Sequence, residues 1–423
     1  MAFILLPALL TAQPAKRTLR PADILKLNTL SSGRISPDGK WLAYALTTTD
    51  SAKDKRNTDI WMMSWDGKEH IQLTNSADGE SNPQWSPDGK YISFVAARNG
   101  GTSQVYLLNR LGGEAIKLTD VKGGLGEYLW SPDGKKLALT ITDPEDTAAK
   151  KNPRPYVINR YRFKVDVTGY QYDTRKTHIY LFDVAAKKLD TLTRGQYDEG
   201  GIQWSPDGSR IAFVSNRTED PDKNSNSDIY IIEARPGATM RQLTTWPGSD
   251  YAPQWSPDGT RLAYNRSSAP DNYIMYDHPV LAVIPAAGGE PTLLATQLDR
   301  GVTNHRWFAN GQKIMAIVTD DCERYVVAFE PATGKMERVI GGPRNFTSVE
   351  PHPDGSWLAG MAEAHVPAEW YALENGALRR LTKANDELMN QLTLGRVEKI
   401  VSKSKDGATV SSLLFLPPGS DGK

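Results

Sequence analysis

Short segments in which apolar and other residues alternate recur along most of the chain. Residues 41–44, 91–95, 210–214 and 261–264 are four examples, and each follows the same kind of polar tetrapeptide. Alternation with a period of two indicates strands that bury one face, and helix-favouring runs of Ala, Leu, Glu and Lys are scarce. The pattern predicts an all-β protein.

The tetrapeptide before these segments is Ser-Pro-Asp-Gly. It begins at Ser36, Ser86, Ser131, Ser205 and Ser256, and degenerate copies begin at Phe308 and His352. The starts are separated by 50, 45, 74, 51, 52 and 44 residues. Proline presets φ, aspartate bonds the backbone ahead of it and glycine accepts positive φ, so each copy is predicted to be the turn of a hairpin.

Two more strands are predicted after each hairpin, for example around residues 59–61 and 72–74 in the first unit. Four strands in each of seven units predict a seven-bladed β-propeller of four-stranded blades over residues 16–395. A solenoid has a similar kind of repeat. A closed ring leaves no long sheet edge exposed, which favours the propeller.

The interval after Ser131 is longer than the others by roughly 25 residues, which fall near residues 143–173. The centre of this insertion, residues 160–164, reads Arg-Tyr-Arg-Phe-Lys and is basic and aromatic. Its flanks at 144–146 and 171–173 are acidic or polar. The insertion is the most distinctive stretch of the chain.

Charge and cysteine content exclude several classes of protein. The chain has 50 Lys plus Arg and 50 Asp plus Glu, and no basic block, so a nucleic-acid partner is not expected. The single cysteine, Cys322, excludes a disulfide framework and a thiolate metal cluster within one chain. We expect Cys322 to be a partly buried small residue beside a strand.

The N-terminal residues are unlike the rest of the chain. An apolar run at 3–10 is followed by small residues at 11–15, which together predict a signal peptide over residues 1–15. The usual positive residues before the run are missing, and the alternative is a loosely packed tail. The run is too short for a membrane anchor, so the prediction is a periplasmic or secreted protein.

The sequence lacks the motifs of several catalytic sites. Neither Gly-x-Ser-x-Gly nor His-Glu-x-x-His occurs, and the six histidines are scattered. Residues 220–228 have alternating oxygen ligands but lack the glycine and glutamate of a calcium loop, so a solvated loop is expected. The aspartates of the turn motif occur once per unit and are interpreted as structural. We predict no metal, no cofactor and no catalytic residue in this chain.

A further strand is predicted after the last unit. A turn at Asp406-Gly407 precedes an apolar segment at 411–416, which ends at Pro417-Pro418-Gly419. This strand belongs to none of the predicted blades.

Three of these features together resemble the prolyl oligopeptidase family of serine peptidases, in its acylaminoacyl-peptidase and dipeptidyl-peptidase branch. They are the Ser-Pro-Asp-Gly units that end in Leu-Thr, the insertion with residues 160–164 and Gly169-Tyr170, and the closing pattern at 404–419. The likeness covers nearly the whole chain. The blade motif by itself is shared with TolB-like propellers.

The resemblance implies that residues 396–423 begin an α/β-hydrolase domain. In the family, the Ser, Asp and His triad and the oxyanion loop lie beyond the point where this sequence stops, so no catalytic residue is carried over. The chain is then expected to be the propeller portion of a truncated serine peptidase and to be inactive by itself.

In that family the propeller caps the active site and holds a terminus of the peptide substrate. Binding a charged terminus requires an opposite charge on a rigid frame, and arginine binds a carboxylate best. The candidates are Arg160 and Arg162, with Tyr161 and Tyr170 as apolar walls. The alternative is a surface loop whose arginines are solvated.

Two other functions stay open. One is a stand-alone periplasmic TolB-like propeller that binds protein partners without catalysis, and the other is an enzyme with a site in the central channel. An isolated propeller of this family is also expected to expose an apolar patch and to form homo-oligomers. Ring closure by strands from both ends of the domain predicts that Ile35 and its neighbours belong to the last blade.

Overall fold

The computed structural model describes residues 15–144, 157–158, 160–167, 169–170, 175–270 and 277–420, without the side chains of Val165 and Tyr170. The predicted signal peptide therefore lies outside the described residues except for its last position. In the described part of the chain, no helix has the length and apolar character needed to cross a membrane.

Among these residues, five sheets contain four antiparallel strands each. The first sheet is β2 (Thr29–Ile35), β3 (Trp41–Asp50), β4 (Lys55–Ser64) and β5 (His70–Gln72). The second is β6 (Glu80–Trp85), β7 (Tyr91–Ala96), β8 (Gln104–Asn109) and β9 (Ile116–Lys117). The third is β10 (Gly124–Trp130), β11 (Lys136–Thr142), β14 (Thr177–Asp183) and β15 (Lys188–Thr191).

The fourth sheet is β16 (Glu199–Trp204), β17 (Arg210–Ser215), β18 (Asp228–Glu233) and β19 (Arg241–Gln242). The fifth is β20 (Asp250–Trp255), β21 (Arg261–Ser267), β22 (Pro279–Pro285) and β23 (Thr292–Leu294).

A larger sheet of eight strands completes the set in the described residues. Its strands are β24 (Val302–Trp307), β25 (Ile314–Asp320), β26 (Glu323–Phe329), β27 (Met336–Ile340), β28 (Arg344–Pro351), β29 (Trp357–Glu363), β30 (Val366–Glu374) and β31 (Ala377–Arg380). The antiparallel groups β24–β27 and β28–β31 are joined by a single parallel residue pair, Arg324 with Asn345.

The remaining elements are short. β1 (Arg17–Thr18) pairs with β32 (Leu392–Thr393), β12 (Lys164–Val165) pairs with β13 (Gly169–Tyr170), and β33 (Val397–Lys403) pairs with β34 (Thr409–Phe415). The helical turns are η1 (Pro21–Lys26), η2 (Arg98–Gly100), η3 (Thr296–Leu298) and α2 (Asp386–Asn390). The all-β class and the four-stranded antiparallel sheets predicted from the sequence are confirmed.

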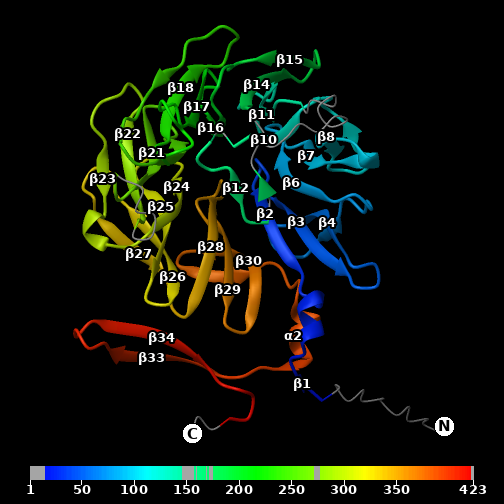
Figure 1. Cartoon of the computed structure of the whole chain (residues 1–423). Helices are drawn as coiled ribbons and strands as arrows, with labels where there is room; N and C mark the ends of the chain where they lie inside the picture. Colours follow the sequence, from blue (N-terminus) through cyan, green and yellow to red (C-terminus); the bar gives the residue numbers. More distant parts are fainter. Residues whose placement is uncertain are drawn as a thin grey trace, which may run out of the picture.

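Figure 1 shows the sheets arranged in sequence order around a centre, with β2, β6, β10, β16, β24 and β28 closest to it. These are the first strands of their sheets or four-stranded groups. First strands of successive sheets contact one another, as β2 does with β6 and β24 with β28. We call these strands the inner strands, and we call the line that they surround the axis.

The turn motif folds as its residues predict. The Ser36 hydroxyl donates to Asp38 Oδ1 at 2.6 Å and accepts from Trp41 N at 3.0 Å, while Gly39 has a φ of +71°. The same bonds recur in later copies, and the Ser86 hydroxyl helps to hold the pKa of Asp88 below its ordinary value. The aspartates therefore fix the turns.

A tryptophan at the end of several inner strands ties each sheet to the one before it. The indole Nε1 groups of Trp85, Trp204, Trp255 and Trp307 donate to backbone carbonyls of Arg34, Leu129, Gln203 and Gln254 at 2.9, 3.2, 3.3 and 3.0 Å. These rings are almost fully buried in apolar clusters between the sheets. Burying one large side chain contributes on the order of 1.5–3 kcal/mol, so the core is divided among the sheet interfaces.

The prediction that Ile35 belongs to the last blade is wrong. Ile35 pairs with Leu42, and β2 is the inner strand of the first sheet. The reason is local, because Ile35 leads directly into the Ser36 turn and the hairpin fixes its partner.

The first sheet meets the β28–β31 group through side chains, and we call this contact the seam. Asn28 N donates to Asn385 Oδ1 at 2.8 Å, and Asn385 Nδ2 donates back to Asn28 O at 3.1 Å. Gly33 lies against Trp370, so that a Cβ there would be 2.8 Å from the indole ring. The parallel pair of β1 and β32 adds two backbone positions.

Cys322 differs from its prediction. It is exposed, with a φ of +66°, in the turn between β25 and β26. The turn places this residue outside the sheet that its neighbours form.

Candidate functional site

The connections between strands emerge on two opposite faces of the ring. Because the strands of each sheet are antiparallel, the turn motifs all lie on one face, which we call the turn face. Six of the seven turn glycines pack near the proline of a neighbouring turn, as Gly134 does with Pro87 at 3.5 Å from an ideal Cβ. The connections after the second strand, and the chain that leaves the fourth strand, lie on the other face, which we call the loop face.

The loop face carries the insertion, which connects β11 to β14, and the loop at 216–227, which connects β17 to β18. It also carries the β33–β34 hairpin, because the chain reaches that hairpin after the fourth strand β31. Two contacts hold the hairpin segment there: Lys399 Nζ pairs with Asp321, and His365 Nε2 donates to Gly395 O at 2.7 Å. Asp321 and His365 both lie in connections of the loop face.

The insertion is fastened to the neighbouring sheet through Asp222. Arg160 donates to Asp222 Oδ1 from Nε at 3.3 Å and from a terminal nitrogen at 3.1 Å, and Arg162 N donates to Asp222 Oδ2 at 2.8 Å. Burial acts to raise the pKa of Asp222, but the hydrogen bonds from the Arg162 backbone and the Arg160 side chain outweigh it and lower that pKa. Asp222 belongs to the segment that resembled a calcium loop.

The structure therefore gives the two predicted arginines different surroundings. The guanidinium of Arg160 is in an ion pair with Asp222, whereas that of Arg162 is near Ser225 Oγ at 3.5 Å and the residue is exposed. Tyr161 is 70% exposed on the same segment. Only the backbone of Tyr170 is described, in β13, so its predicted role as an apolar wall lies outside the described side chains.

A second polar cluster lies on the inner strands. Arg306 of β24 donates to both oxygens of Glu350 of β28, from Nε at 3.1 Å and from a terminal nitrogen at 2.9 Å. Arg34 of β2 donates to Oε1 of the same carboxylate at 3.4 Å. Burial acts to raise the pKa of Glu350, but Arg306 and Arg34 together hold it below its ordinary value.

Sequence reasoning missed this cluster, although the repeat contained a signal for it. Each of the three residues stands two positions before the first residue of a turn motif. Residues at the same position in the other units are Gln84, Leu129, Gln203 and Gln254. Comparing the units position by position would have shown that charges occur there only in the first unit and the last two.

A buried carboxylate recurs at the other end of the inner strands. In the fourth sheet, Glu199 Oε2 accepts from Thr193 at 3.0 Å and is 2.8 Å from His178 Nδ1, and Arg217 pairs with its other oxygen. Glu80 has the equivalent partners Thr74 and Arg98 in the second sheet. Burial raises the pKa of both glutamates. Because the arrangement repeats, the His178–Glu199 pair is interpreted as part of a structural clasp.

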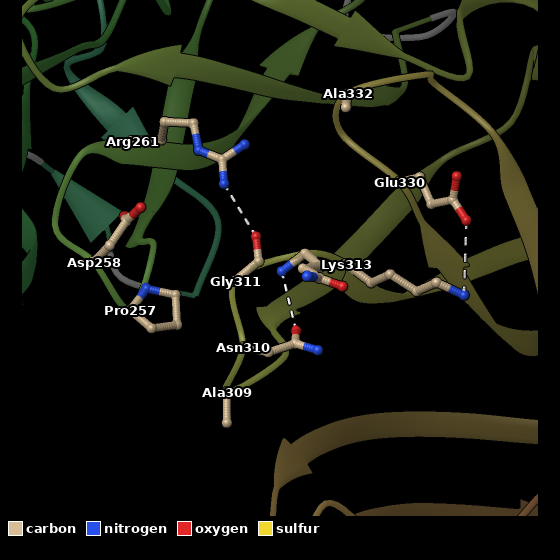
Figure 2. A pocket seen from close by; sticks show the side chains of 10 residues that line it. Pro257, Asp258, Arg261, Ala309, Asn310, Gly311, Lys313, Glu330 and Ala332 are labelled. Carbon is tan, nitrogen blue, oxygen red and sulfur yellow. Dashed lines mark hydrogen bonds and ion pairs between the residues drawn. The ribbon is translucent and has the colours of Figure 1, made fainter.

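A hollow of about 710 Å³ lies on the turn face between two neighbouring turns (Figure 2). Arg261 donates to Gly311 O at 3.0 Å across it, and Lys313 Nζ is 3.9 Å from Glu330. Arg261 also lies over the Trp307 ring at 4.8 Å. These bonds tie adjacent turns together, so the charged groups of the hollow stabilise the ring. Among the described residues, no group of three or more His, Cys, Asp or Glu is placed to hold a metal ion.

The fold and these sites together define an all-β protein of the propeller class, with charged groups on its loop face and near its axis. Residues 26–152 and 165–357 match the family of the TolB beta propeller domain. The chain belongs to this family.

Similar proteins point to peptidases. Dipeptidyl-peptidase 5 of Porphyromonas gingivalis is 29% identical over 95% of this chain and 61% of its own length. The uncharacterized peptidase YuxL of Bacillus subtilis is 26% identical over 96% of this chain and 65% of its own length. The predicted resemblance to the propeller portion of this peptidase group is confirmed, and the chain spans less than two thirds of the length of these relatives.

Solved structures show the same fold at lower identity. The acylaminoacyl peptidase of Pyrococcus horikoshii superimposes with a TM-score of 0.75 at 19% identity, over 94% of this chain and 59% of the other. The β-propeller domain of the Trilobed protease of Pyrococcus furiosus has a TM-score of 0.60 at 18% identity and is covered completely by 85% of this chain.

Proposed function

We propose that this chain is the seven-bladed propeller portion of an exported serine peptidase, and that it controls the access of peptides to a hydrolase domain that continues from residues 396–423. Relatives with peptidase names match nearly all of this chain and leave more than a third of their own length uncovered, which supports the proposal. The stand-alone TolB-like binder shares the family match but does not account for the β33–β34 hairpin.

The β33–β34 hairpin is the observation that carries the proposal. Its two strands pair only with each other in the described structure, and they expose large apolar side chains. These are Ile400, Val401, Val410, Leu413, Leu414 and Phe415. A contiguous exposed apolar surface marks a contact with another protein surface, and unpaired strand edges invite further strands. A following domain that pairs with the hairpin would satisfy both.

The position of the hairpin supports a role in access. The contacts of the hairpin segment with Asp321 and His365 lie on the same face as the insertion, so a domain built on the hairpin could extend over that face. Asp222 holds that insertion against a second sheet, and a rigid frame lowers the entropy that binding a peptide terminus costs. Arg162, with Tyr161 beside it, is then the better candidate for contact with substrate.

The ring of seven blades and the export signal are further parts of the proposal. Each of the seven turn motifs connects the first and second strands of a four-stranded group, and this supports seven blades. The apolar run at 3–10 supports export to the periplasm or the exterior.

The test compares this chain with the longer protein that we propose its gene encodes. We expect the longer protein to cleave short peptides and to leave a folded protein substrate intact, whereas this chain by itself cleaves neither. Cleavage by this chain alone would overturn the proposal, and so would equal cleavage of folded proteins by the longer form. A gene that stops at Lys423 would favour the stand-alone binder.

A further inference from the structure

The charges around Glu350 do not balance. Arg306 occupies both carboxylate oxygens of Glu350, and Arg34 is a second cation on the same group at 3.4 Å. These two arginines and one glutamate leave one net positive charge in this sector of the inner strands. The nearby positions in the same register carry neutral amides, as at Gln84 and Gln254.

Arg34 has hydrogen-bonding capacity to spare. One terminal nitrogen donates to Gly33 O at 3.2 Å and to Glu350. Within the described residues, its Nε and its other terminal nitrogen have no hydrogen-bond partner. An arginine presents five N–H donors in a planar fork, and two of its nitrogens can bind one carboxylate side by side.

The exposed part of the Arg34 side chain faces the axis. An inner strand is covered on its two faces by neighbouring sheets and on its outer edge by the second strand of its own sheet. Because Arg34 also bonds Glu350 of another inner strand, we place the exposed 39% of its side chain on the axial side. Arg306 and Glu350 are also partly exposed there, at 26% and 21%.

An acid on the inner strand of the third sheet is already occupied. Glu127 of β10 accepts from Gly201 N at 2.7 Å and from Ile202 N at 3.2 Å, so its two oxygens bind the backbone of the next inner strand. It caps that strand and leaves the positive sector near Arg34 uncompensated.

We propose that Arg34 is an axial binding site for a carboxylate of a peptide, with Arg306 and Glu350 fixing its position. A single excess charge beside neutral amides suits a singly charged carboxylate. The α-carboxylate of a peptide and the side chain of a glutamate share this chemistry. The assignment of the ligand as a peptide rests on the proposed function, whereas the binding itself is a property of this chain.

The experiment measures binding of tetra-alanine to this chain by titration calorimetry at low salt. Tetra-alanine with a free C-terminus should bind at least about tenfold more tightly than tetra-alanine amide, because a charge-assisted bidentate pair contributes about 1.5–3 kcal/mol. A third peptide, with one glutamate and an amidated C-terminus, distinguishes a side-chain carboxylate from a terminal one. All N-termini are acetylated so that only the carboxylate differs.

Substitutions assign the effect to Arg34. Arg34→Gln should abolish the preference for the free acid, and Arg34→Lys should retain part of it, because lysine keeps the charge without the fork. Gln203→Ala, at the same position of its unit in β16 of the fourth sheet, is the matched control and should leave the preference unchanged. Melting temperatures of all variants show whether the ring stays folded, and Arg34→Lys carries the test if Arg34→Gln does not fold.

Two outcomes would overturn the site: the wild-type chain binding acid and amide equally or not at all, or Arg34→Gln keeping the full preference. Both are measured without any hydrolase domain. Loss of this site and failure of the access function are therefore separate results.

Discussion

His352 of the last four-stranded group stacks on Trp65 of the first sheet, with ring centroids 4.3 Å apart and an angle of 22° between the rings. Its Nε2 also donates to Gly39 O at 2.7 Å. His352 takes the place of the serine that begins the turn motif in five other units. The substitution occurs at the seam, where the turn must contact a sheet from the opposite end of the chain.

This contact predicts unequal costs for the same substitution at two turn glycines. Gly39 and Gly89 have φ values of +71° and +68°, so alanine is strained at both, by roughly 1–2 kcal/mol. At Gly39 a Cβ would also be 2.8 Å from His352, whereas at Gly89 the nearest atom is Pro37 Cδ at 3.7 Å. Gly39→Ala should therefore lower the free energy of unfolding by at least about 1 kcal/mol more than Gly89→Ala. Denaturant unfolding measures both, and equal losses would show that the seam is not tightly packed.

Asp228 should make the stability of the chain depend on pH. Burial raises its pKa from 3.8 to about 6, with the neighbouring charge of Asp250 adding to the effect. The folded state holds the proton of Asp228 more tightly than the unfolded state does. The contribution of this proton to the free energy of unfolding is therefore complete below about pH 4 and is lost as the pH rises through 6. Asp228→Asn cannot ionise. Between pH 4 and pH 7, its free energy of unfolding should therefore rise by roughly 1–3 kcal/mol relative to that of the wild type.

The measurement for Asp228 is the difference in unfolding free energy between variant and wild type across that pH range. Asp220→Asn is the control, because Asp220 lies in an exposed loop and pairs with Lys223. A difference for Asp228→Asn that does not change with pH would contradict the prediction.

Asp222 should control how firmly the insertion is held. Asp222→Ala removes the ion pair with Arg160 and the bond from Arg162 N, which together are charge-assisted and contribute about 1.5–3 kcal/mol. Trypsin should then cleave at Arg160 or Arg162 about tenfold faster, because the segment opens locally more often. Asp220→Ala, two residues away, should leave the rate within about twofold. Equal rates in both variants would show that Asp222 does not anchor the insertion.

In the longer peptidase that we propose, Arg160 and Arg162 should affect substrate affinity. Replacing Arg162 by Ala should raise KM for peptides by about three- to tenfold and leave kcat unchanged, since it removes binding at a site remote from the reacting bond. Arg160→Ala should have the smaller effect on KM, because Asp222 already pairs with its charge. Unchanged kinetics in the double variant would end the assignment of this pair to substrate binding.

The exposed hairpin should make the isolated chain associate. Val401 and Phe415 are 60% and 66% exposed, and apolar area of this kind favours contact with a second copy. Val401→Lys with Phe415→Lys should shift sedimentation toward the monomer, by at least about tenfold in the dissociation constant. Ser402→Lys with Thr409→Lys adds the same charge to the hairpin and should have a much weaker effect. A monomeric wild type at high concentration would contradict the prediction.

The local interactions of the sequence determined the strands and their turns. The hydrogen bonds of the Ser36 hydroxyl lie within five residues, so the motif itself determines the hairpin, in which Ile35 pairs with Leu42. Repetition of that motif then predicted the four-stranded units. It also placed the insertion and one further strand after the last unit outside them.

The tertiary structure decided which distant residues meet. Arg34 and Glu350 are 316 residues apart in the chain, and Arg160 and Asp222 are 62 apart, so neither partner is contained in a local pattern. The error over Ile35 has a different origin, because its pairing with Leu42 is fixed by the local Ser36 turn and not by the closure of the ring. Closing the ring brings opposite ends of the chain into contact, and the charge near the axis and the contacts of the seam arise only through that closure.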